Sequence, residues 1–363
     1  MTDLPGPSRP PIPEFPPSGD GPDAFPPARR KDDPILHGLL FAATLATTMV
    51  VGAKYSLSAR SLLHDGLPFS LTLMGILLAH EMGHYLTSRR HRVNASLPYF
   101  IPFPVGIGTL GAIIRMRGVP RDRGVLLDIG AAGPLVGLAV ALPLALIGFA
   151  RAQVGAVTHA GVGEPLVRYG DSILTWLVVR VVHGALPPGV DVWLTPMAQA
   201  AWLGLFVTAL NLMPAGQFDG GHIVYGLLGS KHGLISHLTF LALVTWGLWG
   251  VTGTMAAWEM ALAAGVNAYA LFLIVSSPRR KWKRNLLIAL VALWYTLRLT
   301  LSDGYPDTAI WLIWAVLLYS FGLDHPPTRD LHRPLDLRRR LVGWFCVAIF
   351  VLTFIPRPIT VIG

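Results

Sequence analysis

Long apolar runs separated by short polar breaks dominate the chain from Ile35 onward. A helix that crosses a bilayer needs about 20 mostly apolar residues. The segment 170–183 is apolar but short and charged, which favours an interfacial helix. The longer runs predict a polytopic α-helical membrane protein with about nine membrane helices, near residues 36–55, 68–88, 124–150, 196–214, 234–251, 255–276, 285–301, 308–323 and 341–355.

Composition supports this fold class and excludes several others. Hydrophobic residues make up 53% of the 363 residues and charged residues only 13%, whereas an ordinary soluble domain carries about 25% charged residues. A soluble enzyme is therefore excluded. The single cysteine, Cys346, excludes an intrachain disulfide and a cysteine-based zinc site.

The chain divides into three predicted parts. Residues 1–34 hold 11 of the 30 prolines and show no apolar period, so we expect a disordered, Pro-rich cytoplasmic tail. Residues 35–276 are expected to form the functional membrane core. Residues 277–363 are expected to add C-terminal transmembrane helices.

The net charge of +9 predicts an orientation in the bilayer rather than a nucleic-acid partner, because most basic residues lie between apolar runs. With the predicted spans, the basic clusters all fall on one side of the membrane. This agreement predicts a cytoplasmic N-terminus. The clusters lie at Arg29–Lys31, Arg89–Arg92, Arg115–Arg123, Arg279–Arg284 and Arg338–Arg340.

The segment 97–118 interrupts the helical pattern with three prolines and several glycines. Its downstream part, from Ile107 to Met116, is expected to form a short hairpin or an extended strand. Irregular backbone at membrane depth is tolerated only against protein or a wet cavity. The segment therefore predicts a cavity beside the second span.

The second span ends in the sequence GILLAHEMGHYL, which contains His80, Glu81 and His84. Positions i and i+4 lie on one face of a helix, so two imidazoles there can bind one metal ion while the adjacent glutamate holds a water against it. This is the HExxH arrangement of zinc proteases. The alternative is a pair of structural histidines at a membrane boundary, although ionisable groups within a span are costly and usually functional.

A catalytic zinc site needs a third protein ligand and one open position. The acidic candidates are Asp128, Asp219 and Glu259. Asp128 is expected to form a salt bridge or to act as a charge at a helix N-terminus, and Glu259 falls at the opposite membrane face. Asp219 is favoured because it follows a broken span, and Gly220 and Gly221 after it would let the backbone approach the metal. His222 remains a competing ligand.

The motifs HEMGH over 80–84 and NLMPAGQFDGG over 211–221 resemble the site-2 protease family of intramembrane zinc metalloproteases. The stretches GTLGAIIRMR and DIGAAGPLVG between them are also similar to that family. The resemblance covers roughly residues 36–230 and fits bacterial and plastid-type members without a PDZ domain. It implies a multi-pass protein of the bacterial inner membrane that hydrolyses peptide bonds within transmembrane helices of other proteins.

In this interpretation one Zn²⁺ per chain is bound by His80, His84 and Asp219, and Glu81 is the general base. Asn211 either steadies the scissile carbonyl or oxyanion, or makes a helix–helix hydrogen bond. The partners expected are a transmembrane-helix substrate and the lipid bilayer, and the oligomeric state is unknown. An extended edge that pairs with the unwound substrate is expected at Gly108, Thr109, Leu110, Gly111, Ala112 and Ile113.

Two rival functions remain open from the sequence. Broken helices and intramembrane charges also occur in transporters, although no second half repeats the broken segment. A catalytically inactive relative that only binds membrane helices is the other alternative. A protease with Glu81→Gln should keep its metal and lose cleavage, whereas a transporter should lose neither its metal nor its flux.

Overall fold

The computed structural model describes residues 32–156, 166–249, 308, 310–330 and 333–362. The described residues from Pro34 onward form one compact unit. The described residues do not include most of the predicted tail, Glu259, or the predicted spans 255–276 and 285–301.

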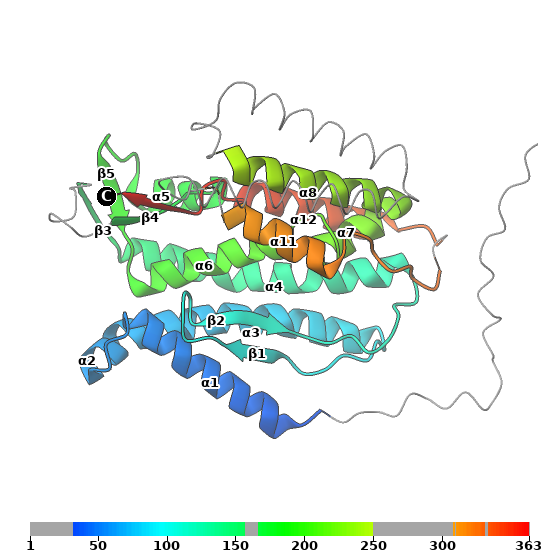
Figure 1. Cartoon of the computed structure of the whole chain (residues 1–363), viewed down its shortest axis with the longest axis horizontal. Helices are drawn as coiled ribbons and strands as arrows, with labels where there is room; N and C mark the ends of the chain where they lie inside the picture. Colours follow the sequence, from blue (N-terminus) through cyan, green and yellow to red (C-terminus); the bar gives the residue numbers. More distant parts are fainter. Residues whose placement is uncertain (1–31, 157–165, 250–307, 309, 331–332, 363) are drawn as a thin grey trace, which may run out of the picture. The chain divides into compact units, whose positions relative to one another are not determined.

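Helices dominate the described part of the chain (Figure 1). They are α1 (Pro34–Gly52), α2 (Ala59–Ser61), η1 (Leu62–Gly66), α3 (Leu67–Arg90), α4 (Arg123–Ala150), α5 (Ile173–His183), α6 (Pro196–Asn211), α7 (Asp219–Leu228), η2 (Gly229–Lys231), α8 (His232–Trp249), α11 (Ile310–Phe321) and α12 (Leu337–Thr353). The strands are β1 (Tyr99–Pro102), β2 (Thr109–Ile113), β3 (Gln153–Ala156), β4 (Leu166–Tyr169), β5 (Val190–Trp193) and β6 (Ile359–Ile362).

Four helical stretches of the described chain are long and apolar enough to cross a membrane: Pro34–Gly52, Ala59–Arg90, Arg123–Ala150 and Asp219–Gly247. They fit a membrane protein, and they correspond to the predicted spans near 36–55, 68–88, 124–150 and 234–251. The short helix expected at 170–183 is present as α5. The prediction of about nine membrane helices is not confirmed.

The predicted span at 196–214 is a shorter helix in the structure. Helix α6 has 16 residues, about 24 Å at ~1.5 Å per residue, whereas the hydrocarbon core is about 30 Å thick. Most of its side chains are buried by protein, among them Trp202 and Leu205. The helix is apolar because neighbouring helices surround it. At the predicted spans 308–323 and 341–355, α11 has 12 residues and α12 has 17.

The core is organised around α4, whose most extensive packing is against α3, followed by α6 and α7. In Figure 1, α4 and α6 lie between α3 on one side and α8, α11 and α12 on the other. Small residues allow the α3–α4 approach, because a Cβ added at Gly83 would lie 2.6 Å from the carbonyl oxygen of Ala132. This close contact fixes how the two helices face each other.

The irregular segment 97–118 forms an antiparallel hairpin. Strand β1 pairs with β2 through Tyr99↔Ile113 and Phe100↔Ala112. The hairpin packs on α1 and α3, and Thr47 donates a hydrogen bond to the carbonyl oxygen of Gly108 over 2.7 Å. Of the two conformations expected for residues 107–116, the structure therefore shows the extended strand, β2, which pairs with β1 as one arm of a longer hairpin.

Candidate metal centre

The HExxH residues lie near the C-terminal end of α3. His80, Glu81 and His84 are all buried. His84 follows His80 by one helical turn, so their rings lie on one face, with centroids 4.8 Å apart. Local helix geometry alone brings these two imidazoles together.

The second part of the centre comes from the break between α6 and α7. Helix α6 ends at Asn211, and α7 begins at Asp219. Pro214 removes a backbone donor in between, and Gly216 adopts a φ of 56°, a value that favours glycine. The interrupted helix thereby presents Asp219 at the first turn of α7.

The glycines after Asp219 have a different role from the one expected. A Cβ added at Gly220 would lie 2.0 Å from the carbonyl oxygen of Leu212, and one at Gly221 would lie 2.4 Å from that of Gly216. These two glycines therefore let the start of α7 pack against the preceding turn. Their added Cβ atoms meet backbone rather than the histidine pair.

Three ligand atoms converge on one point. Asp219 Oδ2 lies 3.1 Å from His80 Nε2 and 3.1 Å from His84 Nε2. The two imidazole nitrogens are also 3.1 Å apart. A tetrahedral zinc ion with bonds of about 2.0 Å separates its ligand atoms by about 3.3 Å. The triangle of nitrogen, nitrogen and oxygen therefore fits a zinc ion, and these residues could hold one.

Helix α4 fixes the His84 ring. Its Nδ1 lies 2.8 Å from the carbonyl oxygen of Ile129. A Cβ added at Gly133 would lie 2.0 Å from His84 Nε2, and one at Gly137 would lie 3.2 Å from the Cβ of His80. The GxxxG pair of α4 thus forms the wall against which both imidazoles pack.

Two further groups reach the same region. The Asn211 Nδ2 atom lies 3.2 Å from His80 Nε2, so its amide contacts the candidate centre across the α3–α6 interface. The carboxyl group of Glu81 interacts with the backbone amide of Ile114, directly after β2. The candidate base and the hairpin are therefore neighbours.

The other residues considered as ligands are engaged elsewhere. Asp128 lies 3.0 Å from His91 Nε2 and 2.7 Å from Arg339 Nη2, so it forms the salt bridge expected for it. The Nδ1 atom of His222 lies 2.7 Å from His325 Nε2, and His222 is not part of the three-residue group.

Sequence reasoning missed two contributions to the centre. The Gly133–Gly137 spacing is typical of tight helix packing, but the spacing does not reveal that the packed surface is the histidine pair. Sequence reasoning also gave no role to the Ile129 carbonyl, because every residue has one and no sequence signal distinguishes it. His325, the partner of His222, lies in the stretch LDHPPTRD over 323–330, after α11.

Comparison with known proteins places the candidate centre in a family context. Residues 68–246 match the model of peptidase family M50. The probable chloroplastic zinc metalloprotease EGY1 of Arabidopsis thaliana is 34% identical over 183 residues, covering 50% of this chain and 31% of the relative. EGY2 of the same plant is 36% identical over 174 residues, covering 47% and 30%. EGY2 of Oryza sativa subsp. indica is 34% identical over 194 residues, covering 53% and 34%.

The chain spans about one third of the length of these curated relatives. The matched region contains both halves of the candidate centre, from α3 to α8. No solved structure matches the chain.

Proposed function

Because this chain belongs, over residues 68–246, to peptidase family M50, the site-2 protease family, we propose that it is a zinc-dependent intramembrane metalloendopeptidase. It hydrolyses peptide bonds within transmembrane helices of other membrane proteins and serves regulated intramembrane proteolysis. The observation that carries this proposal is the convergence of the ligand atoms of His80, His84 and Asp219 within 3.1 Å of one another.

The residues of the candidate centre have separate parts in the proposed reaction. His80, His84 and Asp219 would hold one zinc ion per chain, which would lower the pKa of a water molecule towards neutrality and polarise the scissile carbonyl group. Glu81 accepts the proton of the attacking water and returns it to the leaving amine. Asn211, whose amide nitrogen lies 3.2 Å from His80, donates a hydrogen bond to the developing oxyanion.

The hairpin supports a way to hold the substrate. A transmembrane helix hides its carbonyl groups in its own hydrogen bonds, so it must unwind before attack. One edge of β2 pairs with β1, and no strand of the described chain pairs with the other. Leu110 and Ile113 on β2 are 64% and 56% exposed. The unwound substrate adds to this free edge as a further strand.

The orientation follows from the charges at the helix ends. The proposed membrane is the bacterial inner membrane, with the N-terminus and the Arg89–Arg92 cluster in the cytoplasm. His84 lies less than two helical turns before Arg90, where α3 ends. The reaction then takes place within the bilayer, close to its cytoplasmic face.

The test is a comparison of Glu81→Gln with the full-length wild type in proteoliposomes that contain a reporter transmembrane substrate. We expect Glu81→Gln to keep its zinc and to lose cleavage by a factor of about 10²–10⁴, the usual contribution of a general base. Asp65→Asn, an exposed carboxyl-to-amide change in η1, serves as the matched control and should cleave normally. Zinc-loaded wild type without cleavage would indicate an inactive relative. A Glu81→Gln protein that keeps its zinc and an unchanged solute flux, with no cleavage by the wild type, would favour a transporter.

A further inference from the structure

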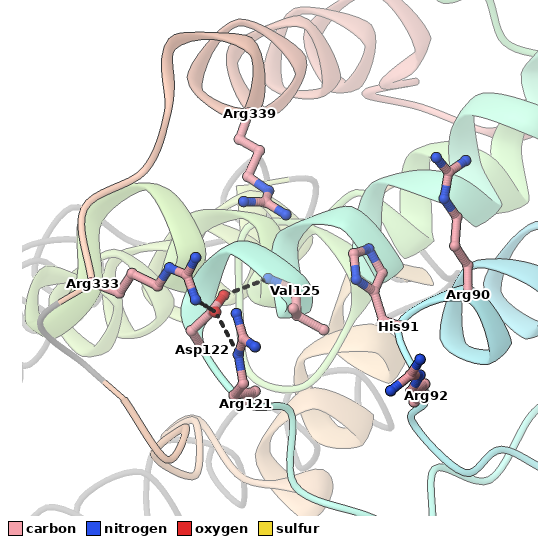
Figure 2. Close-up of a pocket in the computed structure, with 8 residues that line it drawn as sticks. All are labelled: Arg90, His91, Arg92, Arg121, Asp122, Val125, Arg333 and Arg339. Carbon is pink, nitrogen blue, oxygen red and sulfur yellow. Dashed lines mark hydrogen bonds and ion pairs between the residues drawn. The ribbon is translucent and has the colours of Figure 1, made fainter.

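A pocket of about 290 Å³ lies where α3 ends and α4 begins, away from the candidate metal centre. Figure 2 shows that arginine side chains from three separate parts of the chain surround it. The arginines that line it are Arg90, Arg92, Arg121, Arg333 and Arg339. Asp122 is the acidic residue in the lining.

Asp122 organises one side of the pocket. Its side chain is 3% exposed and lies 3.4 Å from Arg121 Nε and 3.2 Å from Arg333 Nη1. It also caps α4 by accepting a hydrogen bond from the Val125 amide over 2.9 Å. Burial opposes ionisation, but these donors outweigh it and hold the pKa of Asp122 below its ordinary value. Asp122 is therefore a carboxylate at neutral pH and offsets one positive charge.

Arg339 is held on the other side by two carboxylates. It lies 2.7 Å from Asp128 and 3.1 Å from Asp336. Asp128 also binds His91 over 3.0 Å. These contacts tie α12 and the end of α3 to α4, so the pocket has a wall held by ion pairs.

Positive charge remains in excess after these pairs are counted. Five arginines line the pocket, and the three carboxylates that pair with them are Asp122, Asp128 and Asp336. Two positive charges are left over. Arg90 and Arg92 have no acidic partner within the part of the chain that the structure describes, and both are exposed. The excess therefore lies on side chains that are free to bind a ligand.

We propose that this pocket binds a phosphate group. Guanidinium groups that converge from several directions match the oxygens of phosphate in paired hydrogen bonds. A phosphomonoester carries a charge of about −1.5 to −2 at neutral pH, which equals the excess. The volume is near the lower limit of ligand pockets, about 300 Å³, so it suits one phosphate group. The N-terminus of the long helix α4 adds a favourable dipole.

The same chemistry has two sources, a free phosphate compound or the headgroup of an anionic lipid. Both α3 and α4 are candidate membrane spans, and the pocket lies where one ends at Arg90 and the other begins at Arg123. Basic pockets between membrane helices bind phosphate-bearing headgroups. An experiment must therefore separate the two sources.

The test uses the full-length protein and two probes. Inorganic phosphate is titrated into the protein in a neutral detergent by calorimetry at constant ionic strength. Separately, the thermal unfolding midpoint is measured in phosphatidylcholine nanodiscs with and without phosphatidic acid. We expect binding of at least one probe. A response to phosphate alone identifies a free phosphate compound as the source, and a response to phosphatidic acid alone identifies a lipid headgroup.

The matched variants are Arg90→Gln/Arg92→Gln in the pocket and Arg60→Gln/Arg89→Gln outside it. Both pairs remove two exposed arginine charges, and neither Arg60 nor Arg89 lines the pocket. We expect the first pair to weaken binding of the responding probe about ten-fold or more, since charge-assisted hydrogen bonds are lost, and the second to bind as the wild type does. The proposal would be overturned if the two double variants bound the responding probe with equal affinity. It would also be overturned if the wild type responded to neither probe.

Discussion

The Nδ1–H group of His84 donates a hydrogen bond to the carbonyl oxygen of Ile129, 2.8 Å away on the neighbouring helix. A carbonyl oxygen can only accept, so the proton must be on Nδ1. The Nε2 lone pair then faces His80 and Asp219, which is the tautomer that a metal ligand needs. The relative position of α3 and α4 therefore determines whether His84 is ready to bind a metal ion.

The contact between Gly133 and His84 gives the first prediction. Gly133→Ala would place a Cβ 2.0 Å from His84 Nε2, so the ring must move away from His80 and Asp219. We expect zinc affinity to fall about ten-fold or more, as it does when groups supporting metal ligands are lost. Zinc content after dialysis against a graded chelator series measures it.

Gly75→Ala is the control for that variant. Gly75 lies on α3, and apart from its own stretch of helix nothing lies within 4 Å of an added Cβ. Alanine is also the better helix former by about 1 kcal/mol. Gly75→Ala should retain zinc and unfold at the wild-type temperature or above. If Gly133→Ala also retains zinc, the glycine does not govern the position of the His84 ring.

The second prediction concerns the ligand set. His80→Ala, His84→Ala and Asp219→Ala should each lower bound zinc, because each removes one corner of the ligand triangle. Asp128→Ala should keep its zinc, since Asp128 binds His91 and Arg339 instead. Metal analysis of the four purified variants decides between them. Zinc loss in Asp128→Ala combined with normal zinc in Asp219→Ala would reverse the assignment.

The third prediction tests the strand edge. Ala112→Pro removes a backbone donor from β2 and should cripple cleavage of a reporter substrate while zinc content stays normal. Zinc content and cleavage are measured on the same preparation. A folded, zinc-loaded Ala112→Pro enzyme with full cleavage would contradict strand addition.

We also expect faster cleavage of substrate helices that contain Gly, Pro or Asn, because these residues weaken the helix that must unwind.

The fourth prediction concerns orientation. In a Cys346→Ala background, Asn94→Cys should react with an impermeant thiol reagent applied from the cytoplasmic side, and Leu57→Cys from the opposite side. Asn94 follows the end of α3 and Leu57 follows α1, and both residues are exposed. Cys346 is buried, so its removal affects no accessible group. Labelling of both positions from the same side would contradict the proposed topology.

The sequence by itself determined the features that depend on local geometry. An HExxH spacing places two imidazoles on one face of any helix, so the pairing of His80 with His84 followed from the 3.6-residue period. The break near Pro214 and Gly216 followed from the loss of a backbone donor and the freedom of glycine. The prolines and glycines also predicted the irregular segment at 97–118, but the sequence left open whether residues 107–116 form a hairpin or an extended strand.

Only the tertiary structure decided the contacts between distant segments. Asp219 meets His84 across 135 positions of the chain, and the arginines of the basic pocket come from segments more than 200 positions apart. The predicted span at 196–214 shows a related limit of hydropathy. An apolar side chain gives the same hydropathy whether it faces lipid or another helix, so the buried helix α6 resembled a membrane span. Helix packing, set by close contacts such as that of Gly83 with Ala132, determines which apolar faces meet and therefore which polar groups are brought together.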